Sequence, residues 1–458
     1  MDAALIMSWR TICQELSPAF SSPTWITFLH ITTGWVLCRS RPTVTNLTCT
    51  IGNHLLGHAA KHWTVYESFF YRARWSLPRL SQLLLTRVVM PLLSAQGGGA
   101  GTPVELIFDG TTCGRCGRHV AYAGYFKDAS VGNTLKTVVH WSHQWLIGCV
   151  VLRPALWPNW ALALPVLFAL YRKKPDCDRQ HPFATIQQMA AQMIVQTRES
   201  LPERLIWACG DGQFAARDVV AALDPRSNLV SRIRSDAALH DLPSNPHKKQ
   251  RGRPRKMGKR LPPPKRFAMR RGNRWRTLTV RKGGRLVKRQ VLSIVCLWYH
   301  VCRDRPIKLL IVRDPAGKEA DDFLFCSDSK VSDVNIVERF YARWSIEEAI
   351  KDGKQLGGFE QTQGWGPRIV ERQAPLALIV QTLVKAWYLR SGFKATWAQP
   401  RGSQICGWLS EKAHPSYLDM LATLRRVIWN DRINVNSTPR GRVRNILETL
   451  RFTLCAAA

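Results

Sequence analysis

Two short apolar runs that both end in Asp-Gly constrain the fold of this chain most strongly. The first is V-E-L-I-F-D-G, in which Asp109 precedes Gly110, and the second is L-I-W-A-C-G-D-G, in which Asp211 precedes Gly212. Runs of this kind are typical of buried strands. An acid at a strand end is commonly a turn former or a helix cap. Because both acids stand where a sheet would open, their shared context favours a pair of functional carboxylates.

The elements between and around these runs alternate between strand and helix. Strand patterns occupy residues 104–109, 119–126, 135–152 and 162–171, a helical pattern occupies residues 182–197, and a further strand occupies residues 205–211. Strands first, then a helix and a parallel strand that ends in Asp, is the order of an RNase H-like core. In such a core the two Asp residues come from neighbouring strands and a third acid comes from a late helix. We therefore expect an α/β fold.

The segment F-Y-A-R-W-S-I-E-E-A-I-K-D-G-K-Q, residues 340–355, offers that third acid. At about 100° per residue, Arg343, Glu347 and Lys354 fall on one stripe of a helix, so a carboxylate lies between two cations. Glu347 could instead be a surface acid that bridges Arg343 and Lys351, which stabilises a helix by only about 0.3–0.5 kcal/mol. Glu348 is the rival ligand, but its angle places it on the apolar side of the helix, so we favour Glu347.

The charge of the chain indicates its partner. A formal net charge of +34, from 66 Lys and Arg against 32 Asp and Glu, favours binding to a polyanion such as DNA. A generally solvated basic surface is the alternative. With 458 residues and 45% hydrophobic content, the chain has enough apolar material for two to four packed domains.

The first 95 or so residues carry helical periodicity and no clusters of strand formers. The stretch from Arg41 to Gly52 reads as a short helix that bears Thr43, Thr45 and Asn46. Asn and Thr can bond base edges in the major groove while Arg reaches guanine or phosphate. Arg41 and Asn46 are therefore candidate DNA contacts, although a plain helical packing domain fits these residues equally well. The run from Ser94 to Pro103 reads as a flexible linker.

The segment from Pro246 to Gln290 holds 19 Lys and Arg and no Asp or Glu. Within it, R-G-R-P-R-K resembles an AT-hook, whose extended backbone lies in a narrow minor groove. A solvated loop is the alternative. The strand patterns that follow suggest a β-rich insertion. The candidate phosphate contacts in the hook are Arg251, Arg253, Arg255 and Lys256.

Cysteine usage and the N-terminus bear on the compartment. Thirteen Cys residues form no regular framework, and the first residues lack the pattern of a signal peptide, so we expect reduced thiols and a cytoplasmic protein. The apolar region from Gly148 to Tyr171 contains three prolines and predicts buried strands rather than a membrane span. Cys113, Cys116 and His119 could form half of a zinc site, but one C-x-x-C pair is weak evidence.

The chain resembles bacterial insertion-sequence transposases of the DDE superfamily, specifically those with a β-rich insertion and the signature Y-x2-R-x3-E-x6-K. Arg343, Glu347 and Lys354 match that spacing, whereas Phe340 stands in the tyrosine position and Tyr341 follows it. The segment after the first Asp and the N-terminal region are also similar, so the resemblance covers most of residues 40–390.

The resemblance implies a metal-dependent DNA enzyme. Asp109, Asp211 and Glu347 would be both the catalytic residues and the ligands of two Mg²⁺ ions, for which Mn²⁺ would substitute. Water would attack the phosphodiester at the transposon end, and the released 3′-OH would attack target DNA in a cut-and-paste reaction. The double-stranded DNA of the transposon ends and the target would be bound by a homodimer. Phosphate contacts are expected from Arg343, Lys354, Lys351, Arg251, Arg253, Arg255, Lys256, Arg41 and Asn46.

The expected organisation has five parts. An all-α DNA-binding domain (1–95) precedes the first part of the RNase H-like catalytic core (96–245), the basic loop and β-rich insertion (246–300), the last part of the core (301–395) and a C-terminal helical region (396–458). Such an enzyme would act in the bacterial cytoplasm, at the nucleoid. Two alternatives remain, namely a catalytically inactive or domesticated transposase-derived DNA-binding protein and a nuclease on the same core that cuts without strand transfer.

Overall fold

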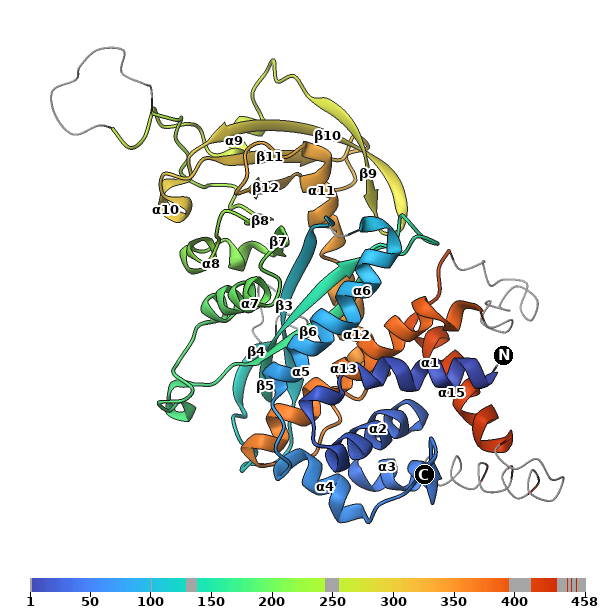
Figure 1. The fold of residues 1–458 in the computed structure, drawn as a ribbon. Coiled ribbons are helices and arrows are strands. Elements are labelled where there is room, and N and C mark those ends of the chain that lie inside the picture. The colour runs from blue at the N-terminus through green and yellow to red at the C-terminus, as the bar shows by residue number, and fades with distance from the viewer. Residues whose placement is uncertain are drawn as a thin grey trace.

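The computed structural model describes residues 2–99, 101–128, 138–243, 255–394 and 413–434, together with residues 443, 446 and 450. It is a mixed α/β fold built on one large sheet (Figure 1). The strands of that sheet, in chain order, are β3 (Val104–Gly114), β4 (Gly124–Asp128), β5 (Val138–Leu152), β6 (Leu162–Leu170), β7 (Ile206–Gly210), β8 (Ser227–Arg232), β9 (Arg276–Lys282), β10 (Arg285–Cys296), β11 (Ile307–Arg313) and β12 (Asp322–Cys326).

The sheet has two halves that differ in strand direction. The order across it is β4-β5-β3-β7-β8-β12-β11-β10-β9, and β6 also pairs with β5. In the first half β5 runs antiparallel to β3 and β6, whereas β3, β7 and β8 run parallel to one another. In the second half every pair is antiparallel. We call strands β12, β11, β10 and β9 the extension side of the sheet, because they extend it beyond the parallel group.

Most strands and the main helix of the first half fall where the sequence predicts them. The run that begins at Val104 is longer than expected, because β3 continues through Gly114 in antiparallel pairing with β5. The expected strand at 119–126 is shorter and later, and forms β4. The predicted helix is α7 (Ile186–Ser200). A capping box formed by Thr185 and Gln188 supplies hydrogen bonds to the amides at its start.

Helices cover both faces of the first half. On one face α7 packs against β3 and β5, and on the other lie α12 (Ser345–Gln355) and α13 (Pro367–Arg390), against β3 and β6. The other described helices that follow β3 in the chain are the one-turn helices η4 (Lys174–Asp176), η5 (Gly212–Phe214) and η6 (Gly392–Lys394), and the helices α8 (Arg217–Ala221), α9 (Pro264–Ala268), α10 (Tyr299–Cys302), α11 (Asp333–Ala342) and α15 (Tyr417–Asn434).

The N-terminal region consists of helices and a small pair of two-residue strands. Its elements are α1 (Asp2–Gln14), η1 (Ser17–Ala19), α2 (Ser22–Leu37), α3 (Val44–Ile51), β1 (His54–Leu55), β2 (His58–Ala59), α4 (Trp63–Tyr71), α5 (Leu77–Leu83), η2 (Leu84–Val89), α6 (Met90–Leu93) and η3 (Ser94–Gly98). The linker prediction is wrong at its start, because Ser94–Gly98 is helical. Arg204 holds this end by donating to Ser94, Gly99 and Thr102.

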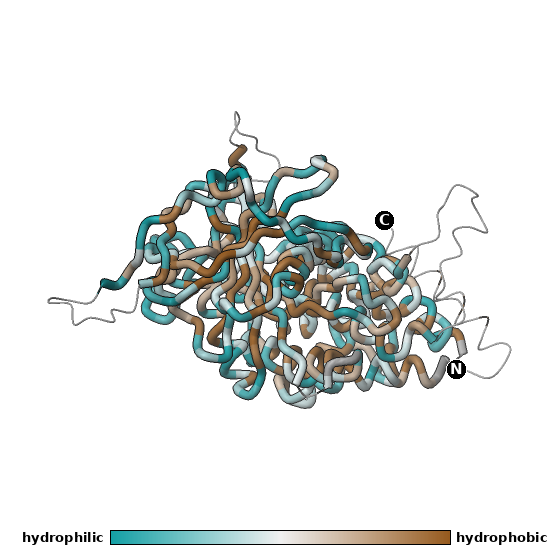
Figure 2. The backbone as a smooth tube through the Cα atoms, turned by 90° about the horizontal axis from the view of Figure 1, so that it is seen from above, coloured by the Kyte–Doolittle hydropathy of each residue, from teal (hydrophilic) through white to brown (hydrophobic). Residues whose placement is uncertain are grey.

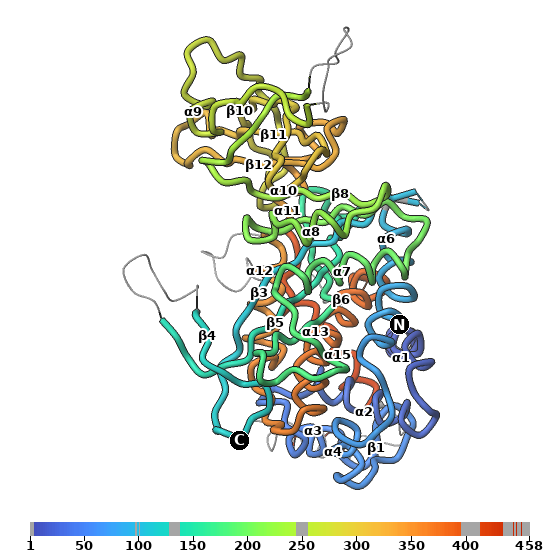
Figure 3. The backbone as a smooth tube through the Cα atoms, turned by 90° about the vertical axis from the view of Figure 1, so that its left-hand side faces the viewer, coloured from blue at the N-terminus to red at the C-terminus, as the bar shows by residue number. Residues whose placement is uncertain are grey.

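This region packs on the C-terminal helices and shares their core. The Trp35 indole donates to the Gly357 carbonyl at 2.7 Å, and the Trp387 indole donates to the Leu5 carbonyl at 3.2 Å. Seen from the side in Figure 3, α1 to α4 gather with α13 and α15 at the end of the molecule opposite β10 to β12. Contacts between residues more than three hundred positions apart therefore seat the N-terminal helices on the rest of the fold.

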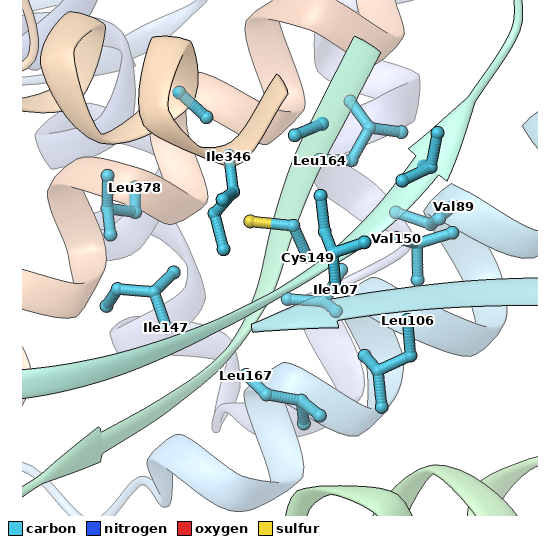
Figure 4. Packing of buried hydrophobic residues seen from close by; sticks show 14 of the residues in the cluster. Val89, Leu106, Ile107, Ile147, Cys149, Val150, Leu164, Leu167, Ile346 and Leu378 are labelled. Carbon is cyan, nitrogen blue, oxygen red and sulfur yellow. The ribbon is translucent and has the colours of Figure 1, made fainter. Parts of the chain in front are cut away.

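The interior is apolar along the whole sheet. Figure 2 shows hydrophobic segments running through the middle and hydrophilic segments along the outside. At the centre of the first half, Ile107 and Cys149 pack beneath Ile346 of α12 and Leu378 of α13 (Figure 4). Among the described residues, none of the helices has the length and apolar character that crossing a lipid bilayer would require.

Candidate active site

The two aspartates predicted from the apolar runs occupy equivalent places on adjacent parallel strands. Val104 of β3 pairs with Ile206 of β7, and the register continues to Ile107 and Cys209, a constant offset of 102 residues. Asp109 and Asp211 are also 102 residues apart in the sequence. Each therefore lies two residues beyond the last paired position, so the register brings the two carboxylates together where β7 ends and the sheet opens.

The chain turns sharply at Asp211. Gly210 is required here, because a Cβ at this position would come within 2.7 Å of the Phe108 and Phe214 rings. The Asp211 side chain accepts from the Gln213 amide at 3.1 Å and so caps η5. Asp211 therefore does cap a turn, as the alternative in the sequence analysis proposed. The same hydrogen bond fixes its carboxylate at the end of β7.

The predicted third acid comes from the junction of two helices. The sequence predicts one helix over residues 340–355, but α11 ends at Ala342 and α12 begins at Ser345. The amides between them bond to the third residue back rather than the fourth, which tightens the chain locally. Arg343 in this tight turn still reaches Glu347, with 3.2 Å between its Nη2 and the Glu347 Oε1.

Arg343 links the acid on the helix to an acid on the sheet. Its Nη1 lies 3.7 Å from the Asp109 Oδ2, and its side chain is only 7% exposed. A guanidinium that is held between two carboxylates and shielded from water interacts with them far more strongly than a surface pair would. Arg343 therefore joins α12 to β3 at the place where Asp109 and Asp211 meet.

The charges around Asp109 show that the three acids share one electrostatic environment. Burial raises the pKa of Asp109 from its usual value of 3.8 to about 6, and the negative charges of Asp211 and Glu347 contribute to the rise. The guanidinium of Arg343 and the amide of Gly110 act in the opposite direction. Nearby negative charges that raise the pKa of a buried carboxyl also mean that a cation bound among them would be stabilised.

The donor set fits a hard divalent ion in its chemistry. Asp109, Asp211 and Glu347 supply carboxylate oxygens, the ligands that Mg²⁺ and Mn²⁺ prefer. Their spacing in this structure is wider than ligation requires, because no group of three His, Cys, Asp or Glu among the described residues is close enough to hold one ion. Arg343 supplies the positive charge there. Closure of the three carboxylates on an ion would therefore require Arg343 to give up part of its contact.

The other acid and cations of α12 lie elsewhere. Glu348 is exposed beside a cavity that Trp160 and His414 line, away from Arg343. Lys351 is exposed. The Lys354 Nζ donates to the Thr112 carbonyl at 2.7 Å and pairs with Glu360 at 2.6 Å. Lys354 therefore ties α12 to β3 in this structure and does not point freely into solvent.

The residues at the tyrosine position of the signature are both buried. Phe340 is 1% exposed and lies under the guanidiniums of Arg232 and Arg343. The Tyr341 hydroxyl accepts from the Arg289 Nε at 3.2 Å. Phe340 thus supports Arg343 through its ring face, and Tyr341 anchors the extension side to α11.

Arg289 was not singled out from the sequence. It lies on β10, is buried, and also pairs with Asp314 and Glu319. Its charge makes it look like its basic neighbours. The alternation Val287, Arg289, Val291 could have revealed that this side chain faces inward.

The expected DNA contacts are scattered over the surface. Arg41 is exposed, and the Asn46 amide donates to the Arg41 carbonyl at 2.9 Å, so Asn46 closes the turn before α3. Arg255 and Lys256 are exposed, while Arg251 and Arg253 lie outside the described residues. The zinc hypothesis gains no support, because Cys113 is buried in β3 whereas Cys116 and His119 are exposed.

Comparison with protein families identifies the chain. The model of the DDE superfamily endonucleases matches residues 15–286, more than half of its length. The protein belongs to the DDE superfamily endonuclease family. The match includes Asp109 and Asp211 and ends before α12. Members of this family generally depend on divalent metal ions.

Other comparisons add little. None of the curated proteins searched matches the chain. Among solved structures it is similar to the piggyBac transposase in a synaptic complex with hairpin DNA, with a TM-score of 0.38 and 11% identity over 97% of this chain and 84% of that one. A likeness this weak carries no argument about the fold.

Proposed function

We propose that this DDE superfamily endonuclease is the transposase of a bacterial insertion sequence, which cuts DNA at the ends of its element and joins them to a target. The observation that carries the proposal is the shared register of β3 and β7, which brings Asp109 and Asp211 together beside Arg343 and Glu347. An endonuclease needs such a group of carboxylates on a firm support.

The order of the strands supports an RNase H-like catalytic core. Three antiparallel strands, β6, β5 and β3, are followed across the sheet by β7 and β8, which run parallel to β3. The first acid lies on the central β3, the second follows β7, and the third begins a late helix. This is the arrangement that the sequence predicts for such a core.

The proposed chemistry divides tasks among the residues of the site. Asp109, Asp211 and Glu347 would hold Mg²⁺, or Mn²⁺ in its place, and the ions when bound would activate the attacking oxygen and stabilise the leaving 3′ oxygen. Arg343, released from the carboxylates, would present its planar guanidinium to a phosphate of the cut strand. Lys354 would keep α12 in register with β3 through Thr112.

DNA selection is assigned to surfaces outside the carboxylates. A site that acts on phosphodiesters carries no sequence information, so base contacts must come from elsewhere. We assign them to the N-terminal helices, with Arg41 and Asn46 at the start of α3. The basic segment that contains Arg255 and Lys256 would add phosphate contacts of any sequence. A homodimer in the bacterial cytoplasm, at the nucleoid, would bring the two transposon ends together.

A plasmid assay tests the proposal. A supercoiled plasmid that carries both ends of the element with their genomic flanks is incubated with the protein and Mg²⁺. We expect the element to be released from its flanks with 3′-OH groups at its own ends and, later, to be joined to a target plasmid, and we expect EDTA to stop both. Cleavage without joined products would identify a nuclease on the same core.

The inactive alternative rests on one observation, namely that the three acids do not converge on a single point in this structure. Specific DNA binding with no cleavage in either Mg²⁺ or Mn²⁺ would show that the protein is a transposase-derived DNA-binding protein, and the catalytic proposal would be abandoned.

A further inference from the structure

A cavity of about 540 Å³ lies beyond the edge of the sheet formed by β6, between α5, α7 and the start of α13. We call it the arginine cavity, because Arg172, Arg368 and Arg372 line it. Trp145 in its wall pairs with Thr111 of β3 on one side and with Leu170 of β6 on the other. This wall is thus one strand away from Thr111, which follows Asp109 by two residues.

The arginine cavity holds more positive charge than its acids balance. Arg172 pairs with Glu371 through Nη2, whereas its Nη1 is buried and has no partner among the described residues. Arg368 is exposed, and the described structure records no hydrogen bond or ion pair of its side chain. Three guanidiniums therefore face one carboxylate, and a buried guanidinium nitrogen lacks an acceptor, which is costly.

The third arginine is fixed and cannot relieve this excess. Arg372 donates to the carbonyls of Phe70, Ala73 and Trp75. Burial lowers the pKa of Arg372, and the like charge of Arg368 lowers it further. Arg368 and Arg372 lie one turn apart on α13 and their guanidiniums repel each other, so an anion placed beside both would be stabilised.

Two further features of the cavity fit a phosphate. The Trp145 indole Nε1 has no hydrogen-bond partner among the described residues, although this side chain is only 1% exposed. The 24-residue α13 begins at this cavity, and its N-cap Gly366 offers no side chain to its first amides. A helix N-terminus favours phosphate. Trp75 is buried, stacked with Phe69 at 5.1 Å and covered by the Arg372 guanidinium at 4.5 Å, so this ring holds Arg372 in place.

We propose that the arginine cavity binds the phosphate of a nucleotide, with Arg368 and Arg172 as the donors. The site is separate from the carboxylates, so the proposal goes beyond the catalytic one and does not depend on it. The phosphate belongs either to a DNA strand that passes from Asp109 over β5 to the edge of the sheet or to a free nucleotide.

Isothermal titration calorimetry of the full chain with thymidine 5′-monophosphate tests the proposal without DNA or metal. We expect the nucleotide to bind, and we expect thymidine, which lacks the phosphate, to bind at least about tenfold more weakly. Arg368→Ala should weaken nucleotide binding by about tenfold or more, because it removes a charge-assisted hydrogen bond. Arg368→Lys should restore part of the affinity.

Arg87→Ala is the matched control, since Arg87 is exposed on η2 and lines none of the four cavities described. It should bind the nucleotide like the wild type, and both alanine variants should melt at the wild-type temperature. Competition by duplex DNA would identify a DNA strand as the source of the phosphate, and its absence a free nucleotide. Equal binding of thymidine and its monophosphate, no binding at millimolar nucleotide, or an Arg368→Ala variant that binds like the wild type would overturn the proposal.

Discussion

The two halves of the sheet are held together in different ways. In the first half, β7 has no exposed residue, and β5 and β6 are mostly buried where they pair with each other. On the extension side, β9 and β10 are half exposed, and charged pairs clamp them to α11. Two of these pairs reach α11, Arg281 with Glu338 and Arg276 with Asp333. Arg289 donates a hydrogen bond to Tyr341 of α11 and pairs with Asp314 and Glu319 between β11 and β12.

The difference matters because both halves meet at the pair of helices α11 and α12. Apolar packing places Ile346 of α12 against the first half. Ion pairs of Asp333 and Glu338, with the hydrogen bond from Arg289 to Tyr341, place α11 against the extension side. Arg343 and Glu347 lie at the joint between the two helices. The position of Glu347 therefore depends both on the apolar packing of α12 and on the polar contacts of α11. Substitutions in each set of contacts can measure the two contributions separately.

The largest effect is expected from the carboxylates of the first half. Asp109→Asn, Asp211→Asn and Glu347→Gln should each lower cleavage on the order of 10³-fold, because each removes a metal ligand and almost no volume. DNA affinity, measured by filter binding, should stay nearly unchanged. Glu348→Gln is the matched control and should cut normally. Full activity in any of the three variants would remove that residue from the site.

The ionic support of the extension side gives the next largest effect. Arg289→Met removes the ion-pair partner of Asp314 and the donor to Tyr341, so it should lower the free energy of unfolding in urea titrations by clearly more than Arg281→Met does. Arg281→Met breaks a more exposed pair with Glu338 and should cost about 1 kcal/mol or less. If the two variants lose the same stability, the extension side is held by packing and the contrast between the halves disappears.

Stability of the metal-free protein should depend on Asp109 in a specific pH range. Its pKa is about 6 in the fold against 3.8 ordinarily, so between these values the folded state binds the extra proton. Stability from this group is therefore full below pH 4 and is lost as pH rises to about 6. Asp109→Asn should raise the free energy of unfolding by about 1–3 kcal/mol at pH 7.5.

The same substitution should change little at pH 3, where the wild-type carboxyl is largely protonated in both states. Asp304→Asn, at an exposed position, serves as the control at both pH values. A variant at Asp109 that is less stable than the wild type at pH 7.5 would show that the contact with Arg343 outweighs burial.

The smallest effect per residue is expected from the basic segment before the extension strands. Neutralising Arg255 and Lys256 should lower the slope of log K against log salt by up to about 0.9 for each phosphate that the protein no longer neutralises, for DNA of any sequence. The double variant Arg87→Ala, Lys330→Ala removes the same charge from two other exposed positions. If both double variants give the same slope, the segment acts only through net charge.

The sequence predicted the first half well because its signals are local. Apolar runs locate β3 and β7, and the equal placement of Asp109 and Asp211 in them already contains the register. Thr185 and Gln188, which cap the start of α7, are also a local signal because they lie only three positions apart. The sequence could not show which distant strands pair, because nothing in the apolar runs indicates that β8 pairs with β12.

The errors have physical causes as well. A helical pattern over residues 340–355 could not reveal the tight turn at Arg343, because one shortened turn keeps the side chains on nearly the same stripe. The Gly-rich run after Leu93 predicted a linker, yet distant Arg204 fixes it. Arg172, Arg368 and Arg372 gave no signal at all, since 196 residues separate the first two and only the fold brings them to one cavity.

The central claim is that the register of β3 and β7 places Asp109 and Asp211 as ligands of one catalytic metal site. Replacing Asp211 by Cys tests it directly, because a thiolate binds Mn²⁺ more readily than Mg²⁺. In the plasmid assay, we expect Asp211→Cys to be inactive with Mg²⁺ and to recover cleavage with Mn²⁺, whereas Asp211→Ala should be inactive with both. If Asp211→Cys cuts equally well in Mg²⁺ and Mn²⁺, or if Asp211→Ala retains cleavage, Asp211 binds no catalytic metal and the account is wrong.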